Sequence, residues 1–332
     1  MTHRYFVSSL VVLTVLAVSA SNASGQAAVS KAKAPAAAAA ATNLKTSWGD
    51  PDLQGVWTNH HGVPLERPGN LAEKSELSPE DVQALETAAA ANRDRKVPGQ
   101  VGAYNSFWLE SGQRSFSKQS SLIVDPPDGK LPLRQDVKAA IDVRNAAKRS
   151  PTYLTPSWDD RDTYERCLTR GMPGAMIPGF YNHNYQIFQT PGYVVIYVEM
   201  IHDARIVPLD GHPRPRIGQW LGDSRGRWEG NTLVVETTNF NGKVNITPPN
   251  LAFGLSPTGR VVERFTRTST DLIEYKFTID DQATFTKPVT VVSPMQRLNE
   301  KIYEYACHEG NIAMHSILSG ARAQEKENAS RK

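Results

Sequence analysis

Apolar and polar residues alternate along the second half of the chain. From residue 181 onward, short segments rich in Val, Ile, Tyr, Phe and Thr are separated by polar turns such as Pro191-Gly192 and Gly230-Asn231. Such alternation is typical of half-buried strands, because successive side chains point to opposite faces of a sheet. The predicted strands lie at 185–190, 193–206, 216–224, 227–230, 231–240, 261–270, 272–280, 287–294 and 301–310, with a tight connection at 229–231. Short strands joined by tight turns favour an antiparallel β-barrel or a strongly curved sheet.

The first half of the folded region has a different pattern. Residues 48–180 are rich in loops and contain one clear helical signal, with Ser78 as N-cap and Pro79 as the first helical residue. The apolar stripe of this helix ends near Arg95. The segment 121–133 predicts a short strand and a turn, and 308–318 predicts a strand end followed by a short C-terminal helix. The sequence therefore predicts a mainly β fold with a loop-rich, partly helical N-terminal wrap.

Composition divides the chain into segments of different character. Arg4 precedes an apolar run that is typical of a Sec-type signal peptide, and an Ala-rich stretch follows it. The predicted parts are a signal peptide at 1–23, a disordered leader at 24–47, one β-rich domain at 48–322 (a wrap at 48–180 and a barrel part at 181–322) and a tail at 323–332. These features predict a periplasmic or secreted protein.

The net charge of the chain limits which kinds of partner it is expected to bind. The formal net charge is +3, and loss of the signal peptide removes only Arg4, which leaves +2. A charge so near zero argues against nucleic acid or an anionic membrane surface as partner. Beyond the signal peptide no apolar run is long enough to cross a membrane. We therefore expect a small-molecule substrate or ligand, with no nucleic acid and no membrane insertion.

The two cysteines of the chain are Cys167 and Cys307. In an exported protein a pair of cysteines favours a disulfide, because the compartment is oxidising. Closing so long a loop stabilises the fold by up to about 4–5 kcal/mol on the chain-entropy model. The competing interpretation is a thiol nucleophile or metal ligand at Cys307, which is followed by His308.

The stretch from Glu199 to Arg205 gathers ionisable side chains at the end of the strand predicted at 193–206. If that strand is regular, its even positions form the core face, with His202 as the polar member. Glu199, Asp203 and Arg205 then share the other face. A histidine oriented by a carboxylate can serve as an acid or a base near neutral pH. The alternative is a half-buried His202 bonded to a backbone carbonyl, beside an Asp203–Arg205 surface ion pair.

These residues define a candidate site. The predicted acid–base residues are His202, Glu199, Asp203 and His308. The predicted substrate-binding residues are Tyr185, Tyr197, Trp220, Tyr305, Arg205 and Glu309. No cofactor is expected, since GxGxxG and P-loop motifs are absent from the sequence. A metal site made of His202, His308 and Glu199 is a weaker alternative, because no closely spaced ligand pair such as HExxH is present.

Several long motifs resemble those of a family of exported, uncharacterised bacterial proteins from acidobacterial and sphingomonad genomes. They include PDLQGVW at 51–57, EMIHDARIVPLDG at 199–211 and GRWEGNTLVV at 226–235. The resemblance covers residues 48–325 and implies export, with no established activity. The hairpin at 226–237 is also similar to strand pairs in lipocalin-like ligand-binding barrels.

Three functional hypotheses follow. The first is an enzyme without an organic cofactor, of the lyase, isomerase or hydrolase type, that uses His202 with a carboxylate on a small, partly aromatic or apolar molecule. The second is a periplasmic small-molecule binding protein without catalysis. The third is a metal-dependent enzyme.

Overall fold

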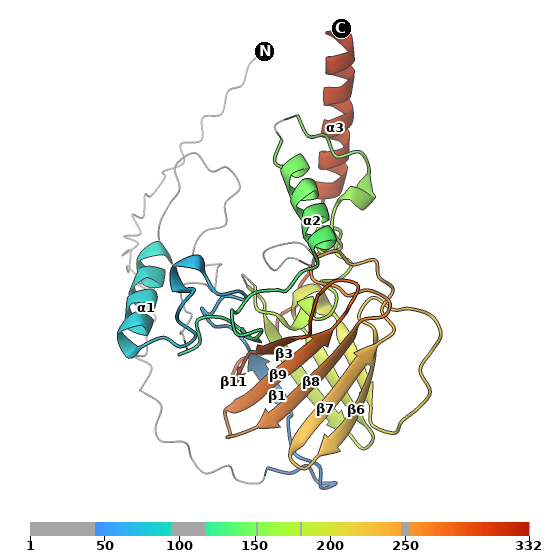
Figure 1. Cartoon of the computed structure of the whole chain (residues 1–332). Helices are drawn as coiled ribbons and strands as arrows, with labels where there is room; N and C mark the ends of the chain where they lie inside the picture. The colour runs from blue at the N-terminus through green and yellow to red at the C-terminus, as the bar shows by residue number, and fades with distance from the viewer. Residues whose placement is uncertain (1–43, 94–116, 151, 180, 247–251, 332) are drawn as a thin grey trace, which may run out of the picture. The chain divides into compact units, whose positions relative to one another are not determined.

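The computed structural model describes residues 44–93, 117–150, 152–179, 181–246 and 252–331. An 11-stranded antiparallel sheet dominates this part of the chain (Figure 1). The strands are β1 (Gly55–Thr58), β2 (Ile123–Asp125), β3 (Asn184–Thr190), β4 (Tyr193–Val198), β5 (Ala204–Pro208), β6 (Asp223–Glu229), β7 (Thr232–Thr238), β8 (Arg260–Arg267), β9 (Leu272–Asp280), β10 (Val289–Val292) and β11 (Met295–Leu298). The α-helices of the described residues are α1 (Pro79–Arg93), α2 (Gln135–Lys148) and α3 (Ala313–Ser330).

The strands follow the order β5-β4-β3-β1-β11-β9-β8-β7-β6, and β10 pairs with β9 and β2. The predicted antiparallel β-barrel or strongly curved sheet is wrong, because the sheet is neither closed nor strongly curled. Its path is open: β5 and β6 are the two ends, and no described ladder of backbone hydrogen bonds joins them. Side chains meet there instead. A Cβ on Gly226 of β6 would lie 2.8 Å from Val207 of β5, so the absence of a side chain at this position lets the two end strands approach.

One face of the sheet carries the hydrophobic core. In β9, Ile273, Tyr275, Phe277 and Ile279 are fully buried at every second position, as the alternation predicts. The ring of Tyr275 stacks on that of Phe265 in β8 with 4.6 Å between centroids. This contact adds to the area-dependent stabilisation that the buried rings supply.

Most of the predicted strands are confirmed, and the turns at 191–192 and 230–231 fall between strands. Three segments differ. Residues 193–206 are interrupted at 199–203 and form β4 and β5 instead of one strand. Residues 216–222 do not form a strand, and they contain two glycines, one of which, Gly222, adopts a φ of 70°. Residues 301–310 are also irregular, because their backbone bonds partly to side chains elsewhere, as at Tyr303. The pattern did not predict β1, β11 or α2; α2 has no buried residue and therefore no core-facing stripe.

Helix α1 begins at Pro79, as predicted. Helix α3 continues through 323–330, where the composition predicts a solvated tail. The residues there are exposed but helical, and the ion pair between Arg331 and Glu327, four residues apart, supports the helix. Midway along the helix, Arg322 donates to the carbonyl oxygen of Pro156 at 2.8 Å, which ties α3 to the segment that follows α2.

No helix within the described residues is long and apolar enough to cross a membrane. The predicted signal peptide and most of the leader lie outside the described residues.

Candidate functional site

A tight turn at 199–203 separates β4 from β5. Met200–His202 form a single 3-10 turn, in which Ile201 and His202 have φ values of 63° and 51°. Because β5 runs back along β4, the alternation restarts after the turn. The predicted single strand at 193–206 and its assignment of faces are therefore wrong: His202 is exposed, whereas Arg205 is buried.

The turn is held in a conformation that a β-branched residue rarely adopts. A left-handed backbone at a residue such as Ile201 costs about 1–3 kcal/mol and persists only when its surroundings enforce it. Here the Ile201 side chain is buried, and Nδ1 of His202 donates to the carbonyl oxygen of Tyr305 at 3.0 Å. Strain of this kind is concentrated at functional sites, which directs attention to the neighbouring Asp203.

Asp203 is a half-buried carboxyl with one oxygen engaged. Its Oδ2 accepts a hydrogen bond from Oγ1 of Thr169 at 2.8 Å. Burial raises the pKa of Asp203 from 3.8 to about 6, against the opposing effects of the Thr169 hydrogen bond and the positive charges of His202 and Arg205. The carboxyl can therefore hold or release a proton near neutral pH.

Asp203 lies in a cleft of about 490 Å³. The cleft is lined by β5, by the start of β6 and by the loop before β6. Its lining residues are Leu168, Asp203, Ala204, Arg205, Ile206, Gly218, Gln219, Trp220, Leu221, Gly222, Asp223 and Ser224. Of the predicted site residues, the structure thus brings Asp203, Arg205 and Trp220 together here.

A buried ion pair lies at the cleft. Nη1 of Arg205 donates to Oε1 of Glu263 at 2.9 Å, Nη2 donates to Oε2, and both side chains are almost completely excluded from solvent. The hydroxyl of Tyr275 donates to Oε1 of the same carboxylate at 2.8 Å. The alternative of an Asp203–Arg205 surface pair is wrong, because Arg205 points inward to β8. Its Nε is buried and has no hydrogen-bond partner among the described residues.

Glu199, His308 and Glu309 do not line the Asp203 cleft. Glu199 is buried and accepts hydrogen bonds from Nδ2 of Asn184 at 2.6 Å and from the backbone N–H of Tyr303 at 3.1 Å. It therefore fixes the 303–307 segment to the turn. His308 and Glu309 are exposed, and no described contact joins either of them to His202.

The predicted aromatic ligand residues are spread over three places. Tyr185 is fully buried, and its hydroxyl donates to the carbonyl oxygen of Ala175 at 3.3 Å. Tyr197 lies half-buried in β4. Tyr305 lines a second cleft, of about 470 Å³, with Tyr181, Asn182 and Asn311 among its neighbours. The fourth predicted aromatic residue, Trp220, lines the Asp203 cleft.

No group of three or more His, Cys, Asp or Glu side chains among the described residues could hold a metal ion. His202, His308 and Glu199 do not form a ligand set, because His202 and Glu199 are each engaged with the 303–305 backbone.

The predicted disulfide between Cys167 and Cys307 is confirmed, with Cα atoms 5.7 Å apart. The thiol alternative at Cys307 is therefore wrong. The bond is consistent with an extracytoplasmic location. It also joins the 167–169 segment, which bonds Asp203 through Thr169, to the 303–307 segment, which bonds His202.

Sequence reasoning missed Thr169, Gln219, Ser224 and Glu263. For Glu263 a signal was present: it occupies a core-facing position between Val261 and Phe265 in β8. An acid at such a position is almost always paired. The loop residues Gln219 and Ser224 carried no such signal, since their place depends on how β5 approaches β6.

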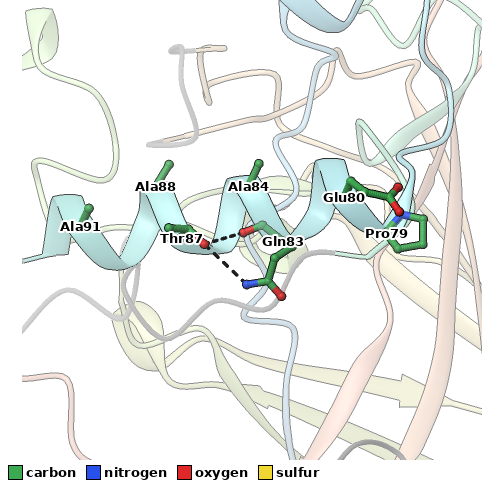
Figure 2. A pocket seen from close by; sticks show the side chains of 7 residues that line it. All are labelled: Pro79, Glu80, Gln83, Ala84, Thr87, Ala88 and Ala91. Carbon is green, nitrogen blue, oxygen red and sulfur yellow. Dashed lines mark hydrogen bonds between the residues drawn. The ribbon is translucent and has the colours of Figure 1, made fainter.

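A larger hollow of about 700 Å³ follows one side of α1 (Figure 2). Its lining comes from this helix alone and consists mostly of small side chains such as Ala84, Ala88 and Ala91. Thr87 there donates to the backbone oxygen of Gln83 at 2.8 Å, a bond within the helix (Figure 2). This arrangement holds no pair of acid and base groups, so we do not assign the site to it.

The raised pKa of Asp203 predicts a pH-dependent stability. The folded state binds the Asp203 proton more tightly than the unfolded state, so this stabilisation is complete below about pH 4 and is lost as pH rises through about 6. Asp203→Asn removes the dependence. We expect its stability relative to the natural protein to grow across this window, to at most about 3 kcal/mol, in urea denaturation at a series of pH values. Asp142→Asn, at an exposed position on α2, is the control; a parallel change in both variants would contradict the prediction.

Comparison with known proteins returns no match, neither to a family model nor to a curated protein nor to a solved structure. The resemblance to exported acidobacterial and sphingomonad proteins stays a prediction, and any function must be argued from the residues themselves.

Proposed function

We propose that the protein is an extracytoplasmic enzyme that performs acid–base chemistry on a small molecule bound in the Asp203 cleft. The observation that carries this proposal is a protonatable carboxyl, with a pKa of about 6, in an open cleft of about 490 Å³. General acid–base catalysis is most efficient when the pKa of the group lies near the working pH. In this proposal Asp203 has the acid–base role that was predicted for His202.

The surroundings suit this role. Thr169 orients the carboxyl by donating to Oδ2, and Oδ1 makes no hydrogen bond with a described residue. Oδ1 is thus available to exchange a proton with a bound molecule. The lining residues Gln219 and Ser224 add an amide and a hydroxyl, and Trp220 adds an aromatic ring. No organic cofactor or metal enters this proposal; reactions of the hydrolase, lyase and isomerase types can proceed with such groups.

One observation favours non-catalytic binding as a second candidate. The other predicted acid–base residues, His202, Glu199 and His308, do not line the cleft. A single carboxyl with polar neighbours can also serve as a hydrogen-bonding group for a ligand that leaves unchanged.

The substitution Asp203→Asn distinguishes the enzyme from the non-catalytic binding protein. A panel of small esters, amides, lactones and hydroxy acids is screened with the full chain, and the variant is tested on any substrate found. We expect turnover to fall by about 10²–10⁴-fold while substrate affinity is kept. The rate of the natural protein should change in a titration near pH 6. Asp142→Asn is the matched control. Binding without turnover by the natural protein would favour the second candidate, and unchanged turnover in Asp203→Asn would overturn the first.

A further inference from the structure

The rim of the Asp203 cleft is apolar, in contrast to its polar interior. Three large apolar side chains that line the cleft are exposed to solvent: Leu168 to 43%, Ile206 to 62% and Trp220 to 38%. Ile217, next to the lining residue Gly218, is exposed to 79%. Single exposed apolar residues are ordinary on a protein surface, whereas a group of them around one opening marks a binding surface.

The charges at the cleft select against an ionic ligand. Arg205 is neutralised by Glu263, and Asp223 is paired with Arg214 and Arg225. An anionic ligand would therefore find no unpaired cation among the described lining residues, and it would lie close to the carboxyls of Asp203 and Asp223. A cationic ligand would hold Asp203 in its ionised form and so remove the proton that the proposed chemistry uses.

We propose that the cleft takes an uncharged amphiphile: a carbonyl or hydroxyl head that reaches Asp203, Gln219 and Ser224, and an apolar body that covers Leu168, Ile206 and Trp220. This inference rests on the proposed function, because it names the substrate class of the same site. The head exchanges hydrogen bonds with the polar lining. Removing the rim side chains from water contributes affinity in proportion to the apolar surface buried.

The test measures equilibrium binding, so that it is separate from turnover. Four probes are titrated into the full chain by calorimetry at a pH below the Asp203 pKa of about 6: octanamide, octane-1-sulfonate, octylammonium and acetamide. The first three share one apolar body and differ in head charge, and acetamide has the uncharged head without the body. We expect octanamide to bind at least about 10-fold more tightly than each of the other three.

Variants locate the binding surface. Ile206→Thr keeps a β-branched side chain on the strand and should weaken octanamide by about 3–10-fold. Leu168→Ser, in a loop, provides a second rim variant should the first not fold. Val143→Thr, at a position on α2 that is 70% exposed, should leave the affinity unchanged.

Each other outcome overturns the inference. Tightest binding of octylammonium would make Asp203 a counter-ion, and tightest binding of octane-1-sulfonate would mean that the cleft accepts anions. Equal affinity for acetamide and octanamide, or an equal effect of Val143→Thr, would show that the rim does not bind the body. Failure to bind any probe would also overturn it. In all these cases the loss of turnover in Asp203→Asn is still measured independently, so the proposed function stands or falls on its own test.

Discussion

Replacing Glu263 with glutamine is expected to lower the free energy of unfolding by about 3–5 kcal/mol. The substitution keeps the shape of the side chain and one acceptor oxygen, but it leaves the guanidinium of Arg205 fully buried without its counter-charge. It also alters the oxygen to which the Tyr275 hydroxyl donates. Urea denaturation of the purified variant, compared with the natural protein, measures the loss.

Two further variants separate charge from packing. Glu229→Gln breaks exposed ion pairs with Arg227 and Arg264 and should change stability far less, because solvent screens exposed pairs. The double variant Arg205→Met, Glu263→Leu removes both charges and should be more stable than Glu263→Gln alone. If Glu263→Gln proves no more harmful than Glu229→Gln, the pair does not act as a buried ion pair.

Removal of the disulfide is expected to cause the second large loss of stability. Replacing both Cys167 and Cys307 with alanine should lower the free energy of unfolding by about 2–5 kcal/mol, because the bond closes a loop with a sequence separation of 140. Removal of the disulfide should also loosen the candidate site. Thr169, beside Cys167, and Tyr305, beside Cys307, bond directly to Asp203 and His202.

Hydrogen exchange distinguishes this local effect from general destabilisation. We expect faster exchange of the 199–205 amides in the double alanine variant, under conditions where it is folded, while the β8–β9 hairpin keeps its protection. Reduction of the natural protein should reproduce the result. Uniformly faster exchange, or none at 199–205, would mean that the bond stabilises the fold without positioning Asp203.

The hairpins of the sheet were predictable because their signals are local. In β8 and β9, alternation places Val261, Phe265 and Tyr275 in the core, and a polar turn separates the strands. The barrel prediction failed because closure depends on whether β5 and β6 exchange backbone hydrogen bonds, and nothing in either strand alone determines this. Helix α2 was missed because it buries no side chain.

The candidate site was predicted only in part, and one local event explains why. The 199–211 motif contains Asp203 and Arg205, which line the cleft, but extrapolating β4 as a regular strand through Ile201 placed His202 in the core. The left-handed turn at Ile201 and His202 reverses that assignment, so Arg205 enters the interior and Asp203 reaches the cleft. Partners from distant segments, such as Thr169 and Glu263, were beyond pattern reasoning because tertiary structure alone brings them there.

The meeting of β5 and β6 has a consequence for self-association. Strands at the ends of a sheet present unpaired backbone groups that can recruit another chain and lead to aggregation. Here these two edges face each other, with Gly226 packed against Val207 and Leu209, and arginines of β6 are paired with acids beside them. The close packing of β5 against β6 thus shields both edges, so a molecule that forced the two strands apart would expose surfaces prone to polymerisation.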